Sequence, residues 1–194
     1  MRIFFLFLII IFFSSCSSKN ILKIETTNQI EINKSSDKTI SIMYSNNTDK
    51  KVELYEKLKK ELTDHGYKVV PNDYDRKYTI DISTIFANEI GKKSTAQEIL
   101  SNTNLNITIG QVFGNVGVSG TIGSKIGSIL GDSLDTKSYQ IILDVTISEH
   151  QNNMIINENI TQVIAERTID EESIENIINM LENKIVEKLV NLFP

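Results

Sequence analysis

The chain has 194 residues, of which 40% are hydrophobic, with a single cysteine and a formal net charge of −5. This length suffices for the core of one domain, and the acidic balance lacks the basic face that nucleic-acid binding requires. One cysteine excludes a disulfide within the chain and any cysteine-based metal or redox motif. We therefore expect neither nucleic acid nor a metal among its partners.

The first 15 residues are a predicted lipoprotein signal peptide. After a short basic start, eleven apolar residues run from Ile3 to Phe13. That length is typical of a secretory signal, about 7–15 residues, whereas a bilayer-spanning helix needs about 20. The small residues Ser14 and Ser15 stand directly before Cys16 and match a lipobox, which predicts cleavage between Ser15 and Cys16.

Cys16 is the predicted site of lipid attachment. An ordinary buried thiol needs a surrounding core, but Cys16 lies in a serine-rich stretch behind an apolar signal. A diacylglycerol group and an N-acyl chain such as palmitate would give more than the two apolar signals that stable anchoring needs. Ser17 stands where an aspartate would favour retention in an inner membrane, so we expect an outer-membrane protein with no other cofactor.

The residues after the signal peptide are expected to divide into two parts. Residues 16–37 would hold the lipidated tether and a first weak strand, and residues 38–194 a single α+β domain. Because Arg2 is the only charged residue removed, 19 basic and 25 acidic side chains remain, a charge of about −6. Period-2 alternation predicts strands over 38–44 and 78–86.

Between these strands, apolar residues spaced three and four apart from Val52 to Leu62 predict an amphipathic helix that ends at Gly66. A short strand is expected at 67–70. The cleanest alternation in the chain, 139–147, predicts a strand that turns at 150–153 and returns over 154–167.

The last element is a predicted helix that begins with a capping-box pattern at Thr168–Glu171. A stripe of isoleucine and leucine follows it from Ile174 to Leu192 and gives the helix one apolar face. Together the patterns predict an α+β fold, in which an antiparallel-rich sheet carries two amphipathic helices.

A central glycine-rich segment, 104–131, is the least ordinary part of the sequence. Lys125 is its only charged residue, and small residues recur at a spacing that lets two helices approach closely. As one helix it would extend about 42 Å and could insert in a membrane core of about 30 Å. The predicted sites of membrane or oligomer packing are Gly110, Gly114, Gly123, Gly127 and Gly131.

Three interpretations of this segment stay open. Its polar side chains are costly in lipid, so we favour a membrane contact in which several copies hide them. Glycine also disfavours a helix in water by about 1 kcal/mol per residue, which is compatible with a flexible loop. Partial alternation over 115–123 is compatible with a strand.

No catalytic pattern stands out. His65 and His150 lack metal-ligand neighbours at helical spacing, and we expect both on the surface. The stretch Gly110–Gly114 lacks the Gly-Lys-Ser/Thr of a phosphate loop, and no nucleophile or paired-carboxylate motif stands out. The chain is therefore not expected to be an enzyme.

Several runs resemble the TraT family, whose members are outer-membrane lipoproteins of conjugative plasmids, also called complement resistance proteins. They are Lys-Thr-Ile-Ser-Ile-Met-Tyr-Ser-Asn-Asn-Thr-Asp-Lys-Lys at 38–51, Gly-Tyr-Lys-Val-Val at 66–70 and Tyr-Thr-Ile-Asp-Ile at 78–82. The order of elements also agrees along nearly the whole chain after the signal. The glycine segment departs from the family pattern, since it is shorter, poorer in alanine and interrupted by Lys125.

The resemblance implies a surface-exposed homo-oligomer that blocks redundant conjugative DNA transfer, called surface exclusion, and that reduces complement killing. Its partners would be membrane lipid, its own copies, and an outer-membrane protein or a donor cell's mating apparatus. The alternative is a lipid-anchored binding or envelope-assembly module that faces the periplasm.

Overall fold

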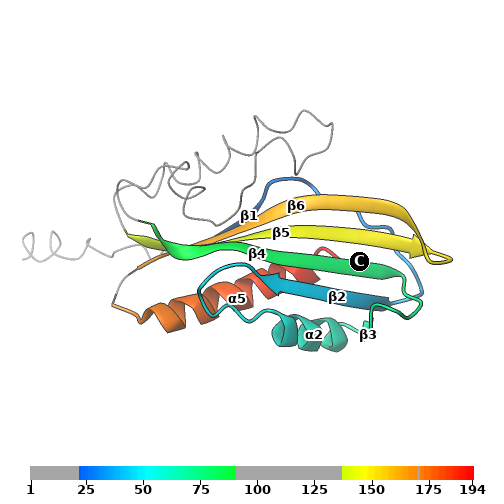
Figure 1. The fold of residues 1–194 in the computed structure, drawn as a ribbon, viewed down its shortest axis with the longest axis horizontal. Helices are drawn as coiled ribbons and strands as arrows, with labels where there is room; N and C mark the ends of the chain where they lie inside the picture. Colours follow the sequence, from blue (N-terminus) through cyan, green and yellow to red (C-terminus); the bar gives the residue numbers. More distant parts are fainter. Residues whose placement is uncertain (1–21, 91–136, 170) are drawn as a thin grey trace, which may run out of the picture.

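The computed structural model describes residues 22–90, 137–169 and 171–194 (Figure 1). In chain order, these residues form β1 (Leu22–Thr26), β2 (Thr39–Asn46), α2 (Tyr55–Asp64), β3 (Lys68–Val69), β4 (Tyr78–Ile90), β5 (Ser138–Gln151), β6 (Met154–Thr168) and α5 (Ile174–Val190).

The strands form one mixed sheet in the order β1-β6-β5-β4-β2-β3. β1, β6, β5 and β4 pair in antiparallel fashion, whereas β2 runs parallel to both of its neighbours, β4 and β3. The parallel pair β2–β3 is possible because α2 provides the crossover between them. The long strands β4, β5 and β6 have 13, 14 and 15 residues and form the centre of the molecule.

Both helices cover the same face of the sheet (Figure 1). Alternation along the strands points one set of side chains at the helices, and these side chains are fully or almost fully buried. The two helices are joined to one another through Glu182 of α5. Its carboxylate accepts the Glu53 backbone N–H at 2.7 Å and pairs with Lys57 Nζ at 2.7 Å. The core residues from the sheet include Ile40, Tyr78, Ile80, Ile141, Leu143, Val145 and Val163, and those from the helices Leu58, Leu62, Ile177, Leu181, Ile185 and Leu189.

The last helix begins later than its sequence pattern suggested. Thr168 is the final residue of β6 and pairs with Ser138, so it does not cap a helix. The N-cap is Ser173, whose side chain accepts a hydrogen bond from the Asn176 backbone N–H at 3.3 Å. The strand pairing of the β6 end thus outweighs a local capping signal.

The predicted fold class needs a correction. The strands form a curled mixed sheet, and within the described ranges no helix is long and apolar enough to cross a membrane. The described residues thus contain no membrane-inserting helix, because their alternating segments build strands and α2 and α5 each keep a polar face. Residues 104–131 lie outside the described residues, as do Ser15 and Cys16. The same holds for Gly110, Gly114, Gly123, Gly127 and Gly131.

Candidate functional site

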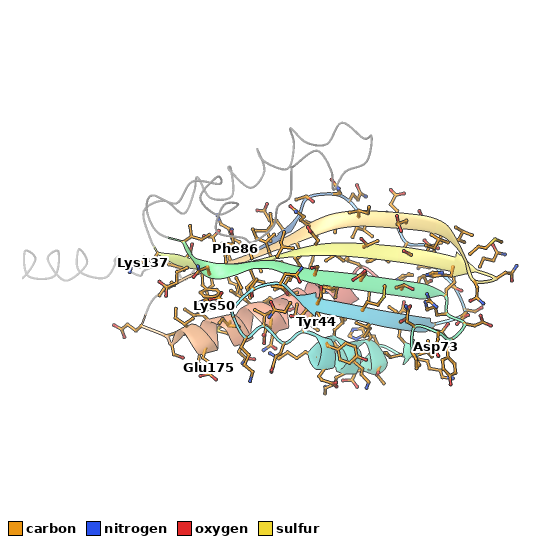
Figure 2. All side chains as sticks on the ribbon, in the orientation of Figure 1. Tyr44, Lys50, Asp73, Phe86, Lys137 and Glu175 are labelled. Atoms are coloured by element: carbon orange, nitrogen blue, oxygen red, sulfur yellow. The ribbon has the colours of Figure 1, made fainter. Side chains whose placement is uncertain are left out.

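The most distinctive surface lies where β5 turns into β6, beside the loop that leads into β4. We call this region the hairpin end. Figure 2 shows Asp73 of that loop at the same end, and Lys137 at the opposite end of the sheet. Asn152 and Asn153 form the two-residue turn, with φ angles of 51° and 61°. Positive φ at both turn positions matches the twist of a tight hairpin, and asparagine tolerates it well.

Three consecutive apolar residues follow this turn. Met154, Ile155 and Ile156 are 65%, 57% and 51% exposed, and we call them the apolar tip. Tyr74, in the loop that precedes β4, is 61% exposed. Large apolar side chains that gather on a surface mark contact sites for partners. The hairpin end is therefore a candidate docking surface.

A polar recess of about 660 Å³ lies beside the apolar tip. It carries charges of both signs from the loop residues Asp75, Arg76 and Lys77 and from Asp37. The remaining lining residues come from the hairpin itself: His150, Gln151, Asn152 and Asn153. An apolar patch beside mixed charges is the usual composition of a protein–protein contact surface.

His150 lies inside this recess and is only 8% exposed, so the prediction of a surface histidine is wrong for this residue. Its Nε2 is 2.9 Å from Thr79 Oγ1, and the same hydroxyl accepts a hydrogen bond from Arg76 Nε at 2.8 Å. Burial, followed by the charges of Arg76 and Lys77, lowers the pKa of His150. The lowered pKa favours the neutral imidazole, whose Nε2 contacts the same Thr79 hydroxyl that Arg76 contacts.

Glu149 is fully buried and joins the hairpin to the segment after β1. Its carboxylate accepts the Asn33 backbone N–H at 3.0 Å and the Asn157 side-chain amide at 2.9 Å, and Lys77 Nζ lies 3.9 Å away. Burial alone would raise the pKa of Glu149, but these hydrogen bonds and the Lys77 charge together lower it. The carboxylate therefore connects the hairpin to the segment after β1 and to Lys77 in the loop before β4.

Within the described ranges, no group of three or more His, Cys, Asp or Glu residues could hold a metal ion. The sequence-predicted site residues, Cys16 and the five glycines, lie outside those ranges. The apolar tip was missed, although three apolar residues in a row directly after a turn break the alternation of a half-buried strand.

The chain belongs to the family of enterobacterial TraT complement resistance proteins, whose family model matches residues 22–187. The resemblance drawn from the sequence is thereby confirmed. The family consists of non-enzymatic outer-membrane lipoproteins, so the chain is a membrane-associated lipoprotein by class. The search of curated proteins found no match.

Solved structures resemble the chain only loosely. The PelC dodecamer from Paraburkholderia phytofirmans has a TM-score of 0.42 at 7% identity, covering 89% of this chain and 98% of that one. A minor lipoprotein from Acinetobacter baumannii has a TM-score of 0.37 at 13% identity, covering 79% and 88%. Lipoprotein GNA1162 from Neisseria meningitidis has a TM-score of 0.36 at 10% identity, covering 79% and 98%.

Proposed function

We propose that this chain acts at the cell surface, where it limits redundant conjugative DNA transfer and reduces complement killing. In this proposal the chain is exported, cut between Ser15 and Cys16, and held on the outer membrane by lipid on Cys16. The observation that supports it most is the family match over residues 22–187, which includes every described strand and most of α5.

The position of the N-terminal strand supports a docking role for the hairpin end. Leu22 pairs with Arg167, near the end of β6, while the apolar tip lies at the start of β6. The 15 residues of β6 extend about 50 Å at about 3.3 Å per residue. Residues 17–21 can span at most about 18 Å. A molecule anchored at Cys16 and standing upright thus presents its hairpin end away from the membrane.

The docking partner in this proposal is a component of the donor's mating apparatus or the outer-membrane protein that serves as its receptor. Occupying or masking that component would prevent a stable mating contact. The apolar tip supplies the contact area and the polar recess supplies charges of both signs.

We also propose that several copies assemble, with Gly123, Gly127 and Gly131 allowing close contact between copies. Detergent-extracted protein should then have the native mass of an oligomer, and Gly127→Leu should shift it toward the monomer. A monomeric wild-type protein, or an assembly unchanged by Gly127→Leu, would contradict this part of the proposal.

Two experiments test the location and the function. Protease shaving of intact cells should cleave the domain, while complete protection would instead favour the periplasm-facing module. Recipient cells that carry the chain should accept conjugative DNA less often than recipients from which it is deleted. Equal transfer frequencies would contradict surface exclusion directly.

A further inference from the structure

One edge of the sheet is open at the hairpin end. β1 pairs with β6 only from Val163 to Arg167, and the last backbone contact along this side joins the Thr27 N–H to the Gln162 carbonyl at 3.0 Å. Within the described ranges, no strand pairs with β6 on this side between Met154 and Asn159, which we call the free edge.

The chain that follows β1 does not complete the sheet there. It is attached to β6 by side chains instead of a backbone ladder. The side-chain amides of Asn157 and Asn159 donate to the Glu31 carbonyl at 3.2 and 3.0 Å, and the segment then continues to the buried carboxylate of Glu149 through Asn33. Among the described residues, the free edge therefore has no backbone ladder on this side, and its only neighbour there is the segment at Glu31, which contacts the side chains of Asn157 and Asn159.

The free edge lacks most of the devices that usually block strand addition. Natural edges carry lysine, proline or a short strand length, because an unpaired edge recruits other chains. Met-Ile-Ile-Asn-Glu-Asn contains neither lysine nor proline, has one charge, Glu158, and exposes three apolar side chains. One protective device is present: Glu149 pairs with Asn157 and His150 with Ile155, so Ile156 is the extra residue of a β-bulge inside the free edge.

From this geometry we infer that the free edge binds an extended segment of another polypeptide as an added β-strand. This inference rests on the proposed function, since it states how the hairpin end would hold its partner. Backbone hydrogen bonds to the edge would supply affinity, and the apolar tip would select a segment with apolar side chains at alternate positions. A stretch of six residues matches an average strand.

The anchor favours a different protein over a second copy as the occupant. Two copies that pair their free edges in antiparallel fashion point their strands in opposite directions. Their Leu22 ends, and with them the lipid anchors, would then lie at opposite ends of the pair, tens of ångströms apart by the length of β6. Two upright copies in one membrane therefore cannot pair their free edges with each other. An extended segment of another protein that approaches from outside the membrane can pair with the free edge.

The test measures backbone hydrogen exchange at the free edge of the full lipidated chain in detergent micelles. The probe is a capped hexapeptide that alternates threonine with valine. Its control is the same peptide N-methylated at every amide, which has no N–H group to donate to the ladder on either edge. The unmodified peptide should slow exchange between Ile155 and Asn159 by about tenfold or more, and the N-methylated peptide should leave it unchanged.

Two variants localise the effect. Ile156→Lys, on the free edge, should abolish the slowing, while Tyr74→Lys, at the same end but off the edge, should retain it. Absence of slowing at millimolar peptide, equal slowing by the N-methylated peptide, or a dimer of the chain that Ile156→Lys dissolves would each overturn the inference. None of these readouts depends on DNA transfer. Strand addition could therefore be confirmed for a chain that does not exclude DNA transfer, and it could be refuted for a chain that does.

Discussion

The two edges of the sheet differ in how readily another strand could pair with them. At one edge, β3 has two residues, begins with Lys68 and is followed by Pro71, so it offers almost nothing for another strand to pair with. At the other, β6 continues beyond its partner β1 for a stretch that carries neither lysine nor proline and exposes the apolar tip. Among the described residues, one edge is thus blocked and the other has no strand partner over this stretch, which is where we propose that binding occurs.

The largest expected effect is a difference in the free energy of unfolding between a substitution in the buried core of the sheet and one in the apolar tip. Leu143 on β5 is fully buried against the helices, so Leu143→Ala should destabilise the protein by about 2–5 kcal/mol through lost contacts and a cavity. Ile156→Ala, on a half-exposed side chain, should change stability by less than about 0.5 kcal/mol. Urea denaturation of both variants measures the difference. Comparable losses of stability in the two variants would show that the apolar tip contributes to the core.

A smaller loss of stability is expected from removing the Glu149 carboxylate, which connects the hairpin end to the segment after β1. Glu149→Ala removes the acceptor of the Asn33 and Asn157 donors and should cost about 1–3 kcal/mol. Because the folded-state pKa of Glu149 is lowered, its stabilisation is complete above pH 4.5, the ordinary value, and is lost as pH falls through the folded pKa.

The stability difference between wild type and Glu149→Ala should therefore narrow in acid. Denaturation curves collected from pH 7 downward follow it. A gap of constant size across that range would mean that the carboxylate charge contributes nothing.

The smallest effect concerns Asp144, in the middle of β5. Burial raises its pKa, and a hydrogen bond from Gln162 Nε2 at 2.8 Å opposes the rise only in part. A raised pKa means that the folded state favours the protonated acid, so stability falls as pH rises from 3.8 through the folded pKa.

Asp144→Asn should accordingly be more stable than wild type at pH 7, with a difference that disappears below pH 3.8. Asp81→Asn, at an exposed position on β4, is the matched control. Thermal denaturation at both pH values compares the two variants, and a destabilised Asp144→Asn protein at pH 7 would refute the expectation.

Strands whose two faces differ were predictable from sequence. β4 and β5 alternate cleanly because one face packs against helices, and their predicted cores at 78–86 and 139–147 lie within the observed strands. The turn after β5 was also placed correctly, since consecutive asparagines favour the left-handed backbone that Asn152 and Asn153 adopt.

Strand order and burial depend on contacts that local patterns do not encode. Nothing in the alternation of β2 specifies that it runs parallel to β4, because that pairing joins residues 38 positions apart, such as Ile40 and Tyr78. His150 was expected at the surface because it neighbours a turn, but Thr79 on another strand provides its partner. The free edge of β6 became visible only once the end of its pairing with β1 was located.

The most direct measurement is a mating assay with recipients that produce wild-type chain, Ile156→Lys or Tyr74→Lys at equal surface amounts. The account predicts that wild-type recipients and Tyr74→Lys recipients receive conjugative DNA at least about tenfold less often than recipients lacking the chain. Recipients with Ile156→Lys should receive it as often as those lacking the chain. Full exclusion by Ile156→Lys would contradict the role of the free edge, and absence of exclusion by the wild-type chain would contradict surface exclusion itself.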